Sequence, residues 1–219
     1  TNPDVVLSTA ATDTINTAFE ITISFSEEVS GFTGTNVTVS NGTLSGLTEQ
    51  TADKVWTATI NPTADGTVTV DVLINEVTDL AGNGNNVSNQ ISVEFDGSGP
   101  AYNTLVPANT TTGVALDTDL QIIFDESVYL GAGFVSIYTS ADELAEQIDV
   151  SDISGYGTTT LTINPVADLA SVTSYYVLVD AGAFEDELGN PFAGINQNTT
   201  WTFETADVSK PAIINTSPA

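Results

Sequence analysis

Internal repetition is the feature that most constrains the fold of this chain. Three segments of the first half return in the same order in the second half: ISFSEEV at 23–29 as IIFDESV at 122–128, TINPTAD at 59–65 as TINPVAD at 162–168, and DLAGN at 79–83 as DELGN at 186–190. Ordered repetition of this kind predicts two diverged copies of one fold. A chain of 219 residues gives each copy a length typical of a small domain. We expect domains at 1–97 and 98–208.

The end of the chain resembles the start of the second copy. PAIINTSPA at 211–219 is similar to PAYNTLVPA at 100–108. We therefore expect 209–219 to be the start of a following repeat that is cut off, in a parent protein with further repeats. The first residue is Thr1 and no signal peptide is recognisable, so we interpret the chain as a piece of something longer.

Both halves contain runs in which apolar and polar residues alternate. Phe19–Phe25 and Ile91–Phe95 alternate strictly, which is typical of strands with one buried face. Further strands are expected at 5–12, 36–40, 55–60, 67–74 and 200–203, with Trp56, Ala58 and Ile60 facing inward. Turn residues such as Asn41-Gly42 separate these runs, and no helical period is visible. The fold class predicted is all-β, with two tandem immunoglobulin-like β-sandwiches joined by a linker at 96–100.

The charge of the chain excludes several kinds of partner. Against 29 acidic residues stand only Lys54 and Lys210, with no Arg and no His, so the net charge is −27. We expect no nucleic-acid partner, because two lysines cannot form a basic patch. We also expect no direct membrane insertion, because no stretch approaches 18 apolar residues. Either a salty medium or bound cations would relieve the self-repulsion, and both explanations stay open.

The residue types needed for most catalytic sites are missing. Without Cys, His or Arg the chain can form no thiolate site, no Ser-His-Asp set and no guanidinium clamp for phosphate. A pair of carboxylates could hydrolyse glycosides, but among 29 acidic residues some pair will always have a suitable spacing. We therefore expect no enzyme and no catalytic residues.

Short motifs in both halves resemble a known family. They lie at 107–109, 123–128, 165–169, 175–177 and 186–191 in the second half, and at 25–29 and 78–83 in the first. Through them the second half is similar to the bacterial Ig-like domains of S-layer and large surface proteins, and the first half is similar to a related bacterial Ig-like group. The resemblance implies long extracellular adhesins or stalks, often with Ca²⁺, and it implies no particular ligand.

The repeated loops suggest where a metal ion would bind. In an immunoglobulin-like sandwich the loops after the second and the sixth strand share one end of the domain, and Ca²⁺ prefers hard oxygen ligands. We predict Ca²⁺ as the cofactor and the following ligands: Glu27, Glu28, Asp79 and Asn83 in the first domain, and Asp96, Asp125, Glu126, Asp186 and Asn190 at or near the start of the second. Asp65 is expected near this junction. The alternative is that Asp79 and Asp186 only close their turns by hydrogen bonds to the backbone.

Together these features predict a structural role. We expect an extracellular extender or stalk segment of a secreted bacterial surface adhesin, in which Ca²⁺ stiffens the domains and their junctions. Its partners would be neighbouring Ig-like repeats of the same chain, and we expect a monomer. One alternative is a module that binds carbohydrate or another cell surface, with Tyr102, Tyr129, Tyr138 and Tyr156 as candidates for exposed stacking. Another is a pair of accessory domains in a secreted hydrolase.

Overall fold

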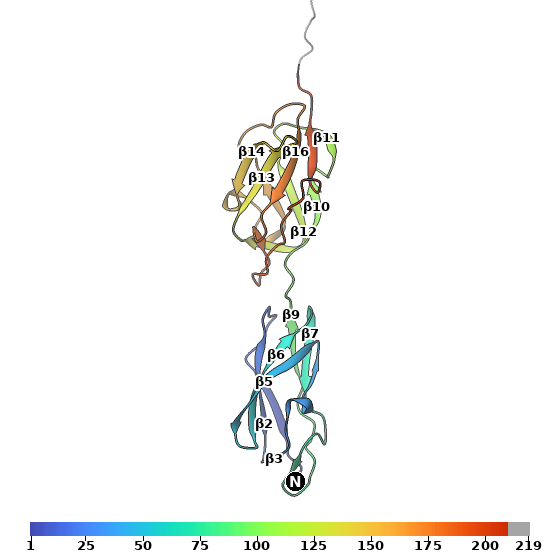
Figure 1. Cartoon of the computed structure of the whole chain (residues 1–219), viewed down its shortest axis with the longest axis vertical. Coiled ribbons are helices and arrows are strands. Elements are labelled where there is room, and N and C mark those ends of the chain that lie inside the picture. Colours follow the sequence, from blue (N-terminus) through green and yellow to red (C-terminus); the bar gives the residue numbers. More distant parts are fainter. Residues whose placement is uncertain (210–219) are drawn as a thin grey trace, which may run out of the picture. The chain divides into compact units, whose positions relative to one another are not determined.

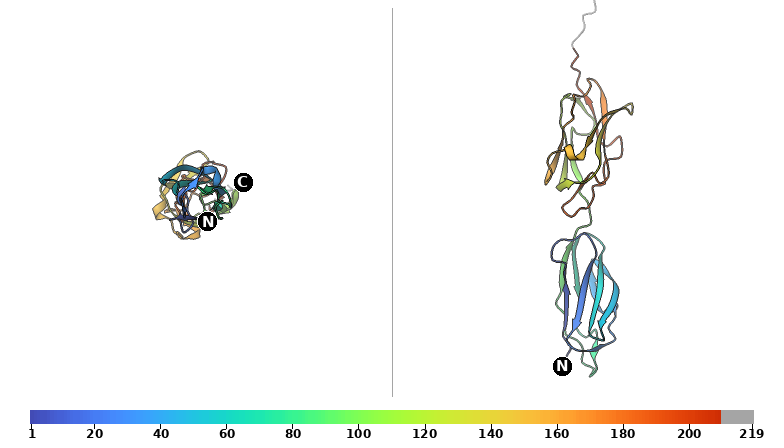
Figure 2. Two further views of the ribbon diagram at one scale, coloured as in Figure 1. Left: turned by 90° about the horizontal axis from the view of Figure 1, so that it is seen from below. Right: turned by 90° about the vertical axis from the view of Figure 1, so that its left-hand side faces the viewer.

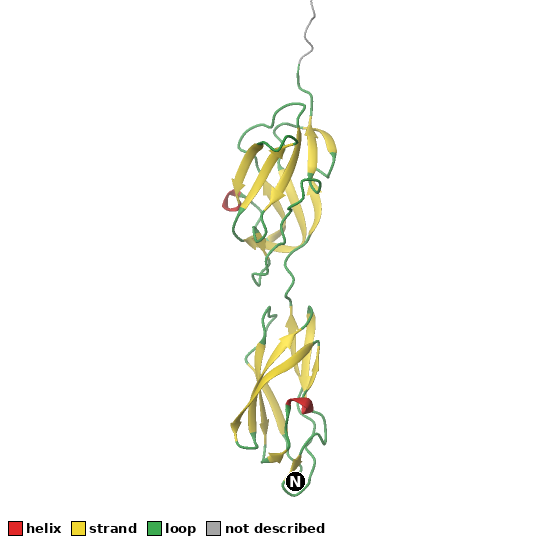
Figure 3. Cartoon of the chain, in the orientation of Figure 1, coloured by secondary structure: helices red, strands yellow, loops and turns green. Residues whose placement is uncertain are grey.

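The computed structural model describes residues 1–209, which fall into two compact units, Thr1–Ser98 and a second that begins at Gly99. Figure 3 shows strands joined by loops in both units, with two three-residue 3-10 turns at Gly34–Asn36 (η1) and Val150–Asp152 (η2). The repeat start expected at 209–219 lies, apart from Ser209, outside the described residues. In the part of the chain that the structure describes, no helix is long and apolar enough to cross a membrane.

The first unit is a sandwich of two antiparallel sheets (Figures 1 and 2). One sheet has the order β1-β2-β6-β5 and the other the order β4-β7-β9, while β3 pairs with β8 at one end. The strands are β1 (Val5–Thr9), β2 (Phe19–Phe25), β3 (Val29–Ser30), β4 (Thr38–Ser40), β5 (Gly42–Thr51), β6 (Val55–Pro62), β7 (Gly66–Asp71), β8 (Thr78–Asp79) and β9 (Ile91–Phe95).

Alternating side chains build the core of the first unit. The apolar residues of β2 and β6 are buried on one face of their sheet, and Trp56, Ala58 and Ile60 face inward as predicted. Val68 and Val70 of β7 are fully buried in the opposing sheet. Because successive side chains of a strand point to opposite faces, each of these strands covers the core with one side only.

Strand β5 was not predicted from the sequence. It runs for ten residues at the edge of its sheet, and all ten are exposed or only half-buried. A strand that buries nothing completely carries no apolar alternation, which explains why its sequence gave no signal. The predicted turn at Asn41-Gly42 is present, and Asn41 adopts a left-handed φ of 55° there. This turn carries the chain from β4 in one sheet to β5 in the other.

The second unit is also a sandwich of two sheets (Figure 1). The smaller sheet has the order β10-β12-β15, with β17 paired to the far end of β12, and the larger has the order β11-β18-β16-β13-β14. The strands are β10 (Tyr102–Val106), β11 (Thr111–Val114), β12 (Leu120–Leu130), β13 (Phe134–Thr139), β14 (Leu144–Asp149), β15 (Thr158–Ile163), β16 (Ser174–Val179), β17 (Phe184–Glu185) and β18 (Thr202–Thr205).

A buried tryptophan anchors the second core. Trp201 is fully buried directly before β18, and its indole N–H donates a hydrogen bond to the carbonyl oxygen of Pro107 at 2.9 Å. The contact joins two segments far apart in sequence. Among residues 1–209, the core itself draws only on residues of the second unit, while the core of the first unit draws only on residues between Val5 and Phe95. Each sandwich is therefore stabilised by its own apolar interior.

We expect Trp201→Phe to lower the free energy of unfolding of the second unit by about 2–4 kcal/mol, because it leaves a cavity and deprives the Pro107 carbonyl of its donor. Urea unfolding followed by hydrogen-exchange mass spectrometry reads the two units separately. The first unit should keep its stability, and the control Phe134→Leu, at a residue that is 39% exposed, should change stability by less than about 1 kcal/mol. A loss shared equally by both units would contradict the separation of the cores.

Candidate cation-binding loops

The two repeated loops have the same hydrogen-bond pattern around a buried aspartate. In the first unit, one oxygen of Asp79 accepts bonds from the backbone N–H groups of Ala81 and Asn83, each at 2.8 Å, and the other oxygen accepts from the Asn83 side chain at 2.8 Å. In the second unit, Asp186 accepts from Leu188 and Asn190 in the same way, at 2.8, 2.8 and 2.7 Å. Both carboxylates thus close their own loops.

The glycine of each motif makes this closure possible. Gly82 and Gly189 both have a φ of 85°, a conformation that residues with a Cβ rarely adopt. In both loops the aspartate carbonyl accepts from the glycine N–H, and the aspartate N–H donates to the carbonyl of the asparagine. The alternative explanation from the sequence, closure of the turn by side-chain to backbone bonds, therefore describes a real feature of the structure.

Hydrogen bonds also stabilise the charged form of Asp79. The side-chain amide of Asn83 is the largest cause that lowers the pKa of this carboxyl below its ordinary value, and the backbone N–H of Asn83 is the next. Asp79 is 6% exposed, so its charge is shielded from water but surrounded by donors. A carboxylate that accepts several N–H bonds is held ionised in this way.

At the end of the first unit the predicted acidic residues come together. Strand β3 follows Glu27 and Glu28 directly and pairs with β8, with Val29 opposite Asp79. Glu27, Glu28 and Asp79 line one shallow hollow beside Leu80. Asn83, the fourth residue predicted here, contacts Asp79 through its amide nitrogen, which is a donor and not a cation ligand.

In the second unit the predicted residues divide into two groups. One carboxylate oxygen of Glu126 lies within 4.8 Å of one oxygen of Asp186, and Asn190 donates to Asp186. Asp125 has a different contact, because neighbouring residues of a strand point to opposite faces. Its carboxylate accepts from the N–H of Ala101 at 2.9 Å, and its own N–H donates to the Ala101 carbonyl at 3.0 Å. Asp125 thus fixes the segment that leads into β10.

Asp96 and Asp65 lie where the chain leaves β9. The N–H of Asp96 donates to the carbonyl of Ile15 at 2.9 Å, and one of its carboxylate oxygens accepts from the N–H of Ser98 at 3.3 Å. Asp65 accepts from the N–H of Gly97 at 2.7 Å and from the hydroxyl of Ser98. The Ser98 hydroxyl is the largest cause that lowers the pKa of Asp65. These bonds hold the last residues of the first unit against its β6–β7 turn.

The oxygen atoms of these loops are of the type that Ca²⁺ prefers as ligands. Carboxylate oxygens are hard ligands, and Ca²⁺ takes six to eight of them together with carbonyl and water oxygens. An ionised carboxylate has about four acceptor sites, of which three are used by N–H donors in Asp79 and in Asp186. Each of these aspartates could offer one further site, so Glu27, Glu28 or Glu126 and water would have to supply the rest.

Asn85 is a structural residue of this end of the first unit that sequence reasoning missed. It is fully buried; its amide group donates to the carbonyls of Leu73 and Asn86 at 2.8 and 2.7 Å and accepts from the N–H of Val77 at 3.0 Å. An asparagine in a polar loop looks like ordinary turn chemistry, and only its burial distinguishes it. Asn85 ties together the loops on either side of β8 and so supports the position of Asp79.

Comparison with protein-family models gives two adjacent matches. Residues 1–95 match one model and residues 96–205 match another, and both are described as "Bacterial Ig-like domain". The two matches together cover nearly all of the described residues. A search of curated proteins found no match.

Solved structures show distant likeness. FdeC, an Escherichia coli adhesin, has 15% sequence identity over 94% of this chain and 64% of its own, with a TM-score of 0.46. InvD from Yersinia pseudotuberculosis has 14% identity over 99% and 61%, with a TM-score of 0.34. CopC from Methylosinus trichosporium OB3b has 16% identity over 52% and 99%, with a TM-score of 0.37. The chain spans less than two thirds of the FdeC and InvD chains, and likenesses at this level carry no functional argument.

We expect the first unit to lose stability in acid through Asp79. Its folded-state pKa is lowered, so its contribution is present above the ordinary aspartate pKa of about 3.9 and is lost as the pH falls through the folded-state value. Asp79→Asn should reduce stability at neutral pH, because it puts an amide NH₂ opposite the Asn83 donor, and should also flatten the acid dependence. Urea unfolding between pH 7 and pH 2, followed by NMR of first-unit amides, measures both effects.

The companion variant Asn83→Ala removes the largest cause of the lowered pKa. In this variant the acid-dependent loss of stability should be smaller, and it should be complete at a higher pH than in the unaltered chain, because the folded-state pKa of Asp79 moves back toward its ordinary value. An acid dependence that is identical in the unaltered chain and in Asp79→Asn would show that other carboxylates cause it.

Proposed function

The chain belongs to the bacterial Ig-like domain family, and from this premise we propose that it is an extender segment of a secreted bacterial surface protein of the adhesin type, with Ca²⁺ bound by its acidic loops. The resemblance and the fold class predicted from the sequence are confirmed by the two family matches. The finer role, its place on the cell surface and its use of calcium are our proposal.

The observation that carries the proposal is the repetition of one self-contained module. Two sandwiches follow each other in the chain, each with its own core and each closed by the same aspartate-glycine-asparagine loop. A module that folds on its own interior can be repeated many times, which is what a spacer requires. The lack of Cys, His and Arg in the sequence agrees with a role that is structural and not catalytic.

Calcium would act on the charge of the chain. Glu27, Glu28 and Asp79 would bind it in the first unit, and Glu126 and Asp186 in the second. The ion would supply positive charge where carboxylates gather, and so reduce the repulsion within a chain of net charge −27. The other predicted ligands take part in hydrogen bonds within the protein: Asn83, Asn190, Asp96 and Asp125. The test of calcium binding therefore concentrates on Glu126.

We expect Glu126→Gln to weaken Ca²⁺ binding to the second unit without unfolding it. Extracellular modules bind Ca²⁺ with a Kd of about 10⁻⁴–10⁻³ M, and a severalfold excess should stabilise the unit by roughly 1 kcal/mol. Isothermal titration calorimetry measures the affinity, and hydrogen exchange measures the stabilisation. The matched control is Asp168→Asn, at an exposed aspartate of the same unit, which should bind calcium as the unaltered chain does. Equal calcium affinity in both variants would remove Glu126 from the site.

We also expect calcium to restrict motion between the two units. Small-angle X-ray scattering of the whole chain, measured once in millimolar calcium and once in EDTA, gives the distribution of interatomic distances under each condition. The distribution should broaden in EDTA while the circular dichroism spectrum stays the same, because each core is independent of the ion. Identical scattering curves would contradict the stiffening role and would leave the family assignment untouched.

A further inference from the structure

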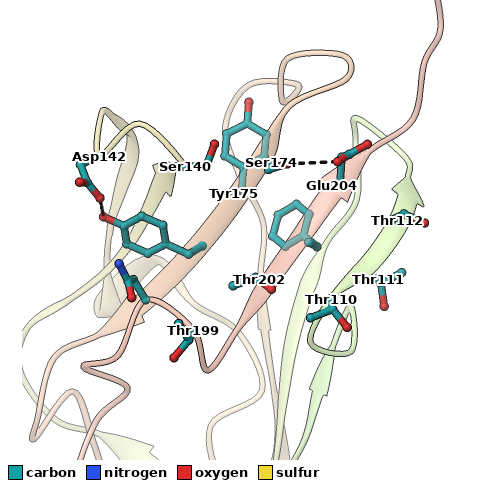
Figure 4. A pocket seen from close by; sticks show the side chains of 13 residues that line it. Thr110, Thr111, Thr112, Ser140, Asp142, Ser174, Tyr175, Thr199, Thr202 and Glu204 are labelled. Atoms are coloured by element: carbon teal, nitrogen blue, oxygen red, sulfur yellow. Dashed lines mark hydrogen bonds between the residues drawn. The ribbon is translucent and has the colours of Figure 1, made fainter.

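The larger sheet of the second unit has a groove on its outer face, lined largely by threonine and serine residues and by two acidic ones. The groove has a volume of about 360 Å³ and is formed by β11, β16 and β18 together with the β13–β14 turn and the segment that precedes β18. Figure 4 shows the side chains that line it, among them Asp142, Ser174, Thr199 and Glu204. Small-molecule sites have volumes of about 300–1,000 Å³, so the groove is large enough for a short ligand.

One tyrosine supplies an aromatic surface in this groove. Tyr176 is the residue of β16 opposite Tyr138 of β13, and the two rings are stacked with centroids 5.2 Å apart and an interplanar angle of 12°. The hydroxyl of Tyr176 donates to a carboxylate oxygen of Asp142 at 2.9 Å. Its ring is therefore fixed by a stacking partner on one side and a hydrogen bond at its tip. Tyr138, predicted from the sequence as a candidate for exposed stacking, packs instead against the Tyr176 ring that lines the groove.

Strand β18, which pairs with β16, supplies hydrogen-bond acceptors beside the Tyr176 ring. Thr202 of β18 lies opposite Tyr176, and Glu204 lies opposite Ser174. The hydroxyl of Ser174 donates to one oxygen of Glu204 at 3.2 Å, as Figure 4 shows. Asp142 and Glu204 thus place two carboxylates at the edges of the groove, and carboxylates form strong hydrogen bonds with hydroxyl donors.

The aromatic ring and the carboxylates of the groove together indicate which class of ligand it would bind. The face of an aromatic ring carries negative charge density and attracts C–H groups, while carboxylate, hydroxyl and amide groups bind hydroxyls. A pyranose ring offers C–H groups on its face and hydroxyls on its rim. Among the described residues that line the groove there are acidic but no basic side chains, and the chain has a net charge of −27, so anionic ligands are repelled.

We propose that the groove over Tyr176, between Asp142 and Glu204, binds a neutral saccharide. The sugar ring lies against the Tyr176 face, and its hydroxyls donate to Asp142 and Glu204. This activity goes beyond the extender role, which does not depend on it. It would give a repeated module a weak contact with glycans, of a kind that becomes useful when many copies act together.

NMR titration of the whole chain tests the proposal directly. Glucose, galactose, mannose and N-acetylglucosamine serve as probes, with sialic acid as the anionic comparison. At least one neutral sugar should shift the amide signals of 138–142, 174–176 and 198–204, and sialic acid should shift none of them. No shift with any neutral sugar, or a stronger response to sialic acid, would overturn the proposal.

Variants then separate the aromatic surface from the acceptors. Tyr176→Phe keeps the ring and should keep binding within a few fold, whereas Tyr176→Ala should weaken it by about tenfold or more, which corresponds to about 1.4 kcal/mol. Glu204→Gln should weaken binding while the spectrum of the free protein stays that of a folded chain. Its matched control is Glu94→Gln in β9, where Glu94 likewise accepts from a hydroxyl of the neighbouring strand, at 2.6 Å from Thr67. Equal binding by Tyr176→Ala and the unaltered chain would exclude the groove as the site.

Discussion

A carboxylate enclosed by N–H donors holds the end of each sandwich together. Asp79 and Asp186 each accept three such bonds from their own loops, and glycine with a left-handed φ allows the chain to wrap around them. Each loop also holds a short strand against its partner strand. In the first unit this strand is β8, which ends at Asp79, and in the second it is β17, which ends directly before Asp186. Pairing of β3 with β8 brings Glu27 and Glu28 beside the first of these loops, and a cation would add to an arrangement that already has internal hydrogen bonds.

Much of this fold could be predicted from the sequence, because burial leaves a pattern wherever one face of a strand is covered. Strands β2 and β9 have the predicted bounds, and Trp56, Ala58 and Ile60 face the core as alternation requires. The sequence shows no such pattern for edge strand β5 or for the buried Asn85, and neither was predicted. The strand exposes most of its side chains, and the asparagine satisfies its hydrogen bonds with loop backbone, which any polar loop could offer.

The sites were harder to predict than the fold, because they depend on side-chain direction and on pairing between distant strands. The sequence placed Asp125 and Glu126 together, but neighbours on a strand face opposite ways, and only Glu126 lies close to Asp186. The groove draws its lining from four separated segments between Thr110 and Glu204. Of its stacked tyrosines, the sequence identified Tyr138, and the register of β13 with β16 brings Tyr176 beside it.

The two separate interiors have a mechanical consequence. Because no buried side chain of one core, as far as the structure describes the chain, belongs to the other, pulling on the ends can unfold one sandwich while its neighbour stays folded. Each rupture would release the contour length stored in a folded module, roughly 300 Å for a segment of this size at full extension. A tether made of such modules would lengthen in discrete steps under load and shorten again as each interior re-forms.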